Sequence, residues 1–235
     1  MNRILLLNVE MPPESGQAPL HPAVLMVEEH CVLVDCGCAG FLPKIEEALR
    51  HRDVKPETVT HLVLTHQDHD HVGAAAALKR RYPNVRVLAS QTEAPYISGA
   101  KKSLRLEQAE RLQAALPPEQ QPLGEAFCNL LRSVEPVPVD RTLADGEKLP
   151  FCGGCWVLAT PGHTPGHISL YLPGLNTVIT GDAMALESGR PVIANPRYTL
   201  DPKRAEESLR RLLALRAGRV LCYHGGELQP EDGPR

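Results

Sequence analysis

Short runs of apolar residues recur along the chain, and most of them end at Gly, Pro, Asn or Asp within a few positions. Runs of this length that are rich in Val, Ile and Leu are typical of buried strands rather than helices. They predict strands at residues 1–7, 23–27, 31–34, 61–64, 85–89, 155–159, 168–172, 177–180 and 219–223. The runs at 23–27 and 31–34 are separated by a short polar segment, so we expect them to form a hairpin.

Three segments between these strands have the pattern of helices. The first spans residues 42–51 and has Pro43 in its first turn, where a missing N–H costs little. The second spans residues 73–82 and has basic residues at its C-terminal end, as the helix dipole favours. The third begins at Asp201, an N-cap residue followed by proline. The order of strand, polar loop, helix and strand over 61–89 indicates a βαβ unit and an α/β fold.

Residues 91–133 differ from their surroundings because they are rich in Leu and Ala and have no alternating pattern. This composition favours helices, with interruptions at Pro117, Pro118 and Pro122. We therefore predict that residues 1–235 form a single domain, with a helical insertion at about 91–133 over one of its faces.

The composition is that of an ordinary globular protein. The chain has 235 residues, of which 43% are hydrophobic and 23% charged, so it can bury a core. The net charge of −3 gives no reason to expect nucleic acid or a membrane surface as a partner. No run of about 18 apolar residues is present, so no transmembrane helix is expected. The sequence leaves homo-oligomerisation open.

The seven cysteines are an odd number, so at least one thiol has no partner within the chain. The apolar run at the N-terminus is shorter than the roughly 7–15 residues of a secretory signal. We therefore expect a reducing, cytoplasmic environment and free thiols. The pairs Cys36/Cys38 and Cys152/Cys155 could form a cysteine metal site or a redox disulfide, but neither has zinc-ribbon spacing, and buried free cysteines are common in strands.

Histidine and aspartate gather at one place in the chain. Three His and two Asp lie between His66 and His71, after a predicted buried strand and before a glycine and a helix. Ligand sites of α/β sheets lie at such C-terminal strand ends. Imidazole and carboxylate are the ligands that zinc and other first-row metals use. A single histidine would be read as a surface residue, but this cluster predicts a metal site.

Three further strand ends carry the same kinds of side chain. His163 and His167 lie in a loop rich in Gly and Pro, Asp182 directly follows a strand, and His224 follows the last strand. Each of these signals is weak by itself, because polar residues often cap strands. Their occurrence at successive strand ends of one chain indicates a shared site.

With these motifs, the sequence from Val24 to Gly226 resembles the metallo-β-lactamase-fold hydrolase superfamily. Residues 32–37 resemble the early strand of the family, whose Asp is structural, and residues 64–73 resemble its His-x-His-x-Asp-His segment. His163, Asp182 and His224 correspond to its later motifs, in the right order. The resemblance implies an α/β fold (α+β by some schemes), a four-layer αββα sandwich of two mixed sheets with the metal site at the sheet edge.

The resemblance also implies two divalent metal ions, bridged by Asp182. The side chains for the first ion would be His66, Asp68, His163 and Asp182, and those for the second Asp70, His71, Asp182 and His224. Position 68 departs from the family, which usually has His there. Zinc is the expected metal, but a carboxylate makes the first position harder and more anionic, which leaves manganese or iron as alternatives. His69 is an alternative ligand through a shifted loop, whereas His167 is expected to fix its own loop or to be merely polar.

Two metal ions about 3.5–4 Å apart can share a hydroxide and polarise a carbonyl or phosphoryl oxygen. We therefore predict a metallo-hydrolase that uses a metal-bridging hydroxide on an ester, thioester or lactone, with a small molecule as substrate and the insertion holding an acyl chain. Asp70 would orient the water and move its proton. Tyr198 would contact the substrate carbonyl, as in some lactonases of the family, although an ordinary half-buried tyrosine explains it as well.

Other functions remain open for this ligand set. One is a di-iron redox protein of the same fold, which has a carboxylate where most members have the second His and needs an external electron donor. Others are a phosphodiesterase-type hydrolase and a metal-binding regulator without turnover.

Overall fold

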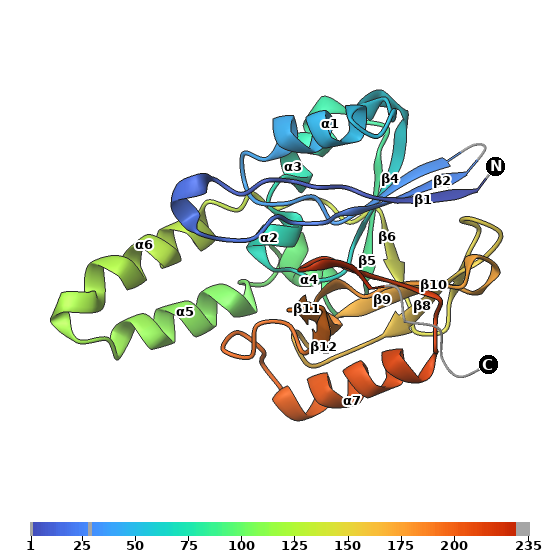
Figure 1. The fold of residues 1–235 in the computed structure, drawn as a ribbon. Helices are drawn as coiled ribbons and strands as arrows, with labels where there is room; N and C mark the ends of the chain where they lie inside the picture. The colour runs from blue at the N-terminus through green and yellow to red at the C-terminus, as the bar shows by residue number, and fades with distance from the viewer. Residues whose placement is uncertain (1, 28–29, 229–235) are drawn as a thin grey trace.

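The computed structural model describes residues 2–27 and 30–228. Within these residues, two six-stranded mixed sheets face each other, and helices cover their outer faces (Figure 1). The layers are therefore helix, sheet, sheet, helix, which confirms the predicted αββα sandwich. No helix in this part of the chain is long and apolar enough to cross a bilayer.

The strands follow one another in a simple order within each sheet. The first sheet, in spatial order, contains β1 (Arg3–Leu6), β2 (Ala23–Val27), β3 (His30–Val34), β4 (Val59–Leu64), β5 (Arg86–Ser90) and β6 (Arg141–Leu143). The second contains β14 (Gly226–Leu228), β13 (Arg219–Cys222), β10 (Thr177–Ile179), β9 (Ile168–Leu172), β8 (Cys155–Ala159) and β7 (Lys148–Leu149). A small separate hairpin is formed by β11 (Ala185–Glu187) and β12 (Arg190–Val192). The helices are α1 (Leu42–Arg50), α2 (His69–Val72), α3 (Ala75–Arg81), α4 (Ala94–Ile97), α5 (Leu104–Ala114), α6 (Gln121–Arg132) and α7 (Pro202–Ala214).

Both faces of each sheet are buried, which explains why the strands read as continuous apolar runs. In β3, Val32 and Val34 point into the core between the sheets, whereas Leu33 points to the layer of α1 and α3. This alternation is the period-two pattern of a strand. Ile45 of α1 packs on the outer face of the first sheet, and Leu212 of α7 packs on the outer face of the second. The sandwich therefore has three apolar layers.

The helix predicted at 73–82 begins earlier than expected and is interrupted. The chain turns into α2 at His69, because the carbonyl oxygen of Asp68 accepts the N–H groups of His71 and Val72. At the joint before α3, a Cβ on Gly73 would lie 2.2 Å from the backbone nitrogen of Ala39, so only glycine allows this close approach. The polar segment after β4 is therefore part loop and part helix.

The insertion at 91–133 is helical, as its composition predicts, but it does not lie over one face. α5 and α6 form a hairpin that projects away from the sheets (Figure 1). We call this hairpin, residues 104–132, the helical arm. It has a small core of its own around Ala109, Cys128 and Leu131, which is why it does not need the face of a sheet.

Candidate metal centre

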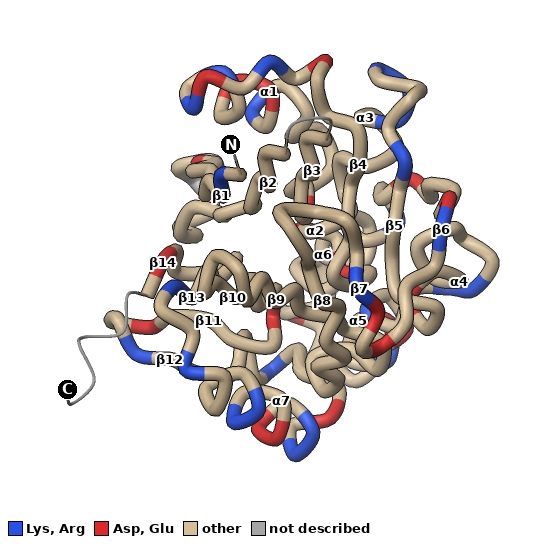
Figure 2. Tube along the Cα trace, turned by 90° about the vertical axis from the view of Figure 1, so that its right-hand side faces the viewer, with Lys and Arg blue, Asp and Glu red and all other residues tan. Residues whose placement is uncertain are grey.

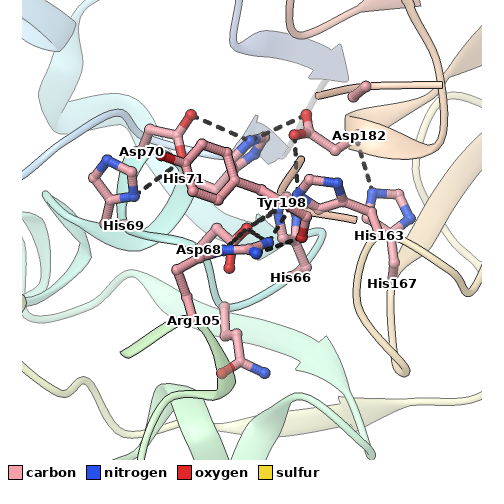
Figure 3. A network of polar contacts seen from close by, with 12 residues as sticks. His66, Asp68, His69, Asp70, His71, Arg105, His163, His167, Asp182 and Tyr198 are labelled. Atoms are coloured by element: carbon pink, nitrogen blue, oxygen red, sulfur yellow. Dashed lines mark hydrogen bonds and ion pairs between the residues drawn. The ribbon is translucent and has the colours of Figure 1, made fainter. Parts of the chain in front are cut away.

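The four strand ends that carry the predicted ligands meet at one edge of the sandwich. His66 and the residues after it follow β4, His163 follows β8, Asp182 follows β10 and His224 follows β13. The side chains of His66, His163 and Asp182 turn toward a common centre (Figure 3), and His224 Nε2 lies 3.4 Å from Asp182 Oδ1. The structure thus brings together all of the positions that the sequence assigned as ligands.

The first group consists of His66, Asp68 and His163, whose ligand atoms all lie within 4.8 Å of one another. Asp68 Oδ2 lies 3.6 Å from His66 Nε2 and 3.0 Å from His163 Nε2. His163 Nε2 lies 3.4 Å from Asp182 Oδ2. A tetrahedral ion with bonds of about 2.0–2.2 Å would hold its ligand atoms about 3.4 Å apart. The group therefore has the dimensions of a metal site.

The second group consists of Asp70, His71 and His224, again with Asp182 beside it. His224 Nε2 lies 3.4 Å from both Asp70 Oδ2 and Asp182 Oδ1. His71 Nε2 lies 3.2 Å from Asp182 Oδ1. Asp182 thus offers Oδ2 to the first group and Oδ1 to the second, which is the arrangement of a bridging carboxylate.

Several atoms of the site are buried and have no hydrogen-bond partner. They are His66 Nε2, Asp68 Oδ1, His71 Nε2 and Asp182 Oδ1. Buried polar atoms are nearly always paired, so a cluster of unpaired ones calls for an explanation. These atoms belong to side chains whose ligand atoms lie close together, and divalent cations bound among them would supply the missing partners. The residues therefore fit two metal ions.

Asp35 holds two of these histidines in place from behind. It is buried, and its Oδ2 accepts a hydrogen bond of 2.9 Å from His71 Nδ1 and one of 2.8 Å from the Thr65 hydroxyl. Thr65 Oγ1 in turn lies 3.0 Å from His66 Nδ1. With both Nδ1 atoms occupied, the Nε2 atoms face the site. Partners of this kind fix the tautomer and orientation of metal-binding histidines.

His167 lies behind the site and contacts the loop that carries Asp182. Its Nε2 accepts the backbone N–H of Asp182 at 2.9 Å, and its Nδ1 lies 2.9 Å from Thr160 Oγ1. Burial, with a smaller contribution from His66, holds the pKa of His167 well below its usual value. The neutral imidazole is the form that can accept the Asp182 N–H. His167 therefore positions a ligand and is not one itself.

The carboxylates of the site are ionised. Burial opposes their charge, but His224 and His71 hold the pKa of Asp182 well below its usual value. Burial also opposes the charge of Asp70, but His71 and His69 lower its pKa below the usual value. Burial opposes the charge of His71, but Asp182, Asp35 and Asp70 raise its pKa well above the usual value. The centre thus concentrates negative charge, which favours binding of cations.

Arg105 is a member of the site that the sequence analysis did not find. It lies on α5, is only 3% exposed, and donates to Asp68 Oδ2 from Nε at 3.1 Å and from Nη2 at 2.5 Å (Figure 3). Its Nη1 donates to the carbonyl oxygen of Tyr198 and to Gln108 Oε1. The guanidinium and His163 outweigh the burial of Asp68 and keep the pKa of its carboxyl well below the usual range. The available signal was Asp68 itself, because a buried carboxylate in place of an imidazole calls for a cation.

Glu93 is a second residue that no motif pointed to. Its fully buried carboxylate accepts the backbone N–H of Gln67 at 3.1 Å, the Gln67 side-chain amide at 3.0 Å and the Gly166 N–H at 2.8 Å. It therefore ties the loop after β4 to the loop after β8. Tyr223 has a comparable role, since its hydroxyl donates to the carbonyl oxygen of Asp70 at 2.6 Å.

The site opens into a cavity of about 420 Å³. The side chains of Asp70 and His224 are 20% and 32% exposed, so they face this space. The other lining residues are Gln17, Ala18, Leu20, Asp68, His69, Arg105, Phe127, Leu130, His163, Asp182, Asn195 and Tyr198. His69 Nδ1 lies 3.5 Å from Asp70 Oδ1, but His69 belongs to neither ligand group.

Along the Cα trace, Lys and Arg positions are interspersed among Asp and Glu positions (Figure 2). Tyr198 lies at the wall of the metal cavity, half-buried between the arm and the site. Its ring centre is 5.2 Å from the guanidinium carbon of Arg105 and 5.6 Å from the ring centre of Phe127. The tyrosine predicted to contact substrate therefore lines the same cavity as the ligands, and its catalytic role stays a prediction.

A sandwich of this kind, with paired His and Asp groups at one edge of its sheets, defines a class of metal-dependent hydrolase. The chain belongs to the metallo-beta-lactamase superfamily, whose family model matches residues 20–224. It is 28% identical over 207 residues to a probable metallo-hydrolase of Bacillus subtilis, YflN, covering 83% of this chain and 75% of that protein. It is 30% identical over 187 residues to a hydroxyacylglutathione hydrolase of Brucella anthropi. That match covers 78% of this chain but spans only 52% of the relative.

Solved structures show the same fold. A metallo-beta-lactamase family protein of Thermus thermophilus, TTHA1429, superposes with a TM-score of 0.73 at 26% identity, covering 96% of this chain and 74% of that one. TTHA1623, solved in a di-iron-bound form, superposes with a TM-score of 0.63 at 27% identity. The match covers 94% of this chain and 93% of that one. Sequence and structure therefore agree on the family and leave the native metal and the substrate open.

Proposed function

We propose that this protein hydrolyses a carboxylic ester, thioester or lactone of a small molecule with the help of two divalent metal ions. The observation that carries the proposal is the shared Asp182, which joins two His and Asp groups whose free lone pairs converge beside an open cavity. Bound metal ions in such a site activate water and polarise the substrate carbonyl. Zinc is the expected metal, and the di-iron form of a related structure supports iron as the alternative.

Asp70 is the residue proposed to handle the proton. It is ionised, it faces the cavity, and it lies within 3.9 Å of His71 and 3.4 Å of His224. Its carboxylate can accept a hydrogen bond from the attacking water and then hold the proton that the water loses. The hydroxyl of Tyr223, which donates to the backbone of Asp70, keeps that carboxylate in position.

Tyr198 is proposed to bind the carbonyl oxygen of the substrate. Its phenol is a hydrogen-bond donor at the wall of the cavity, and Arg105 fixes its backbone by donating to its carbonyl oxygen. A neutral donor that meets the oxygen as negative charge develops would stabilise the transition state more than the substrate.

An apolar groove supports an acyl substrate rather than a phosphodiester. A second cavity, of about 280 Å³, lies along the helical arm and shares Phe127 and Tyr198 with the metal cavity. Its walls include Ala109, Leu112, Leu116 and Leu123, together with the polar side chains of Gln113, Gln120 and Arg197. We call this cavity the arm groove. An acyl chain entering it would bury apolar surface while its carbonyl stays beside the ligands. The name hydroxyacylglutathione hydrolase, carried by several relatives, agrees with an acyl substrate.

The proposal is tested with purified protein loaded with zinc, manganese or iron. Its metal content is measured by mass spectrometry. Its rates of hydrolysis are then measured on aryl esters, thioesters, lactones and phosphodiesters. We expect turnover of at least one acyl class, its loss on chelation, and its return with metal. Asp182→Asn, which keeps the size of the bridging residue, should lose activity and bound metal together. A fully loaded protein that is inactive on every ester would refute the proposal.

Two observations favour the redox alternative: the carboxylate at Asp68 and the di-iron form of a related structure. Iron-loaded protein that consumes oxygen when given an external reductant, and hydrolyses nothing, would establish that alternative instead.

A further inference from the structure

The two ligand groups differ in one respect, which is the presence of a built-in cation. Arg105 places Nε and Nη2 on the same carboxylate oxygen, Asp68 Oδ2, and Nη2 also lies 3.3 Å from His163 Nε2 (Figure 3). Both contacted atoms belong to the first group. In the part of the chain that the structure describes, no Lys or Arg forms an ion pair with Asp70 or Asp182, whose partners are histidines.

The oxygen that Arg105 contacts is also the oxygen that faces the other ligands of the first group. Asp68 Oδ2 is the atom 3.6 Å from His66 Nε2 and 3.0 Å from His163 Nε2. A carboxylate oxygen has two lone pairs, and two guanidinium N–H groups already point at this one. A metal ion that takes this oxygen would therefore share it with the guanidinium, and one that takes Asp68 Oδ1, which has no hydrogen-bond partner, would still bind a carboxylate whose charge Arg105 already compensates.

Arg105 does not fill the first position. His66 Nε2 has no hydrogen-bond partner, so the guanidinium stays on the side of Asp68 and His163 and leaves the His66 side open. A metal ion at the first position would consequently lie within a few ångströms of a fixed positive charge, in a buried place where screening is weak. Among residues 2–27 and 30–228, no Lys or Arg forms an ion pair with the carboxylates of the second position.

Resting on the proposed metal centre, we propose that Arg105 competes with the first metal ion for Asp68, so that the two positions bind metal with unequal affinity. The second position, at Asp70, His71 and His224, fills first. The first position fills at least about ten-fold more weakly, since a tenfold ratio is only about 1.4 kcal/mol and a single buried charge contact exceeds that. The helical arm, which carries Arg105, thereby sets the metal content of the site.

The test is a titration of metal-free protein with Co²⁺, followed by calorimetry and by the visible absorption of the bound ion. Wild-type protein should bind one ion tightly and a second at least about ten-fold more weakly. Arg105→Met removes the charge and keeps an apolar side chain of similar length. It should reduce the ratio of the two dissociation constants about ten-fold, because the more weakly bound ion binds more tightly. Arg111→Met is the matched control, because it makes the same change on an exposed position of the same helix. It should behave as wild type.

The outcomes separate the proposals. Equal affinities for two ions in the wild-type protein, or a weaker second ion in Arg105→Met, would overturn the role of Arg105 and leave the metal centre standing. Wild-type protein that binds no Co²⁺ would instead refute the proposed function. If Arg105→Met does not fold, Arg105→Ala is titrated with Co²⁺ in the absence and presence of methylguanidinium. The ratio of the two Co²⁺ dissociation constants should increase as methylguanidinium is added, because that cation takes the place of the missing side chain. The wild-type titration is independent of every variant.

Discussion

Asp35 shows how far a single side chain behind the site can reach. It is fully buried, has a positive φ of 61°, and receives hydrogen bonds from His71 and from Thr65. Through these two residues it sets the direction of the Nε2 atoms of His71 and His66. The sequence indicated only that this aspartate is structural. Its contact with a ligand depends on the crossing from β3 to β4, which spacing along the chain does not reveal.

Asp35→Asn keeps the shape of the side chain but removes its charge. We expect the metal affinity of the second position to fall about 10- to 100-fold, because His71 loses its carboxylate partner. Chelator competition measures this change. Asp53→Asn is the control, since Asp53 also has a positive φ, of 58°, but is exposed and does not line the metal cavity. An unchanged affinity in Asp35→Asn would show that the hydrogen bond does not tune the ligand.

His167 gives a prediction for pH. Its pKa in the folded protein lies well below the usual value because of burial. The unfolded chain takes up a proton as the pH falls through about 6.5, whereas the folded protein excludes it. The stabilisation from keeping His167 neutral is therefore complete above about pH 6.5 and is lost as the pH falls toward the folded-state pKa.

Urea unfolding of metal-free wild type and His167→Gln, at about pH 7.5 and about pH 5.5, tests this prediction. The wild type should lose about 1 kcal/mol more stability than the variant over that range. The other titrating groups are common to both proteins, so the difference isolates His167. The same loss in both proteins would mean that His167 is protonated in the fold.

The helical arm carries function at the scale of an element. α5 provides both Arg105, at the ligands, and Leu112, at the wall of the arm groove. Composition was enough to predict that this segment is helical. It could not reveal that the helices form a projecting hairpin, because that depends on the small core around Ala109 and Leu131. It also could not identify Arg105, since a buried arginine looks like any surface arginine in a sequence.

The arm groove predicts a dependence on acyl length. Leu112→Glu places a charge at its wall, so KM for long-chain esters should rise about ten-fold while the acetyl ester is unaffected. Leu213→Glu is the control, because Leu213 on α7 is 44% exposed and Leu112 is 46% exposed. Steady-state kinetics over a series of chain lengths checks both. An equal effect on short and long esters would argue against the groove as the acyl site.

Strand prediction succeeded where a strand is long enough to show a pattern. β2, β3, β4, β5, β8 and β9 each have five or six residues and overlap the predicted runs, and the shorter β1, β10 and β13 lie within predicted runs as well. The strands β6, β7, β11, β12 and β14 have only two or three residues, which is too short for any periodicity, and they were missed. These short strands lie at sheet edges or in the separate hairpin, and none of them carries a proposed ligand, although Leu186 of β11 donates its backbone N–H to the carbonyl oxygen of His224.

For the whole molecule, the sandwich could be predicted only through the resemblance to a family. Apolar runs indicate strands but not which sheets face each other. The ligands could be predicted because they follow strands, whereas Arg105 and Glu93 could not, because a buried charge is defined by what the fold places beside it. Free thiols were expected, and all seven cysteines are buried and form no disulfide bond.

Metal removal is a prediction for the whole molecule, because the site joins loops from both sheets. Ions that bind only the folded state stabilise it by about 2.7 kcal/mol when their free concentration is 100 times Kd. Chelated protein should therefore unfold at a lower temperature, and added metal should restore the transition. Differential scanning calorimetry at matched pH measures this. A transition that is indifferent to both treatments would mean that the folded chain binds no metal.

The double role of α5 has a further consequence. A helix that touches both an acyl chain and a metal ligand makes the two binding equilibria interdependent, and thermodynamic linkage requires the effect to be mutual. A long substrate that pushes α5 outward would loosen Arg105 from Asp68 and favour the first ion, and that ion would favour the long substrate to the same degree. The enzyme would then be most fully metallated in the presence of the substrates that fill its groove.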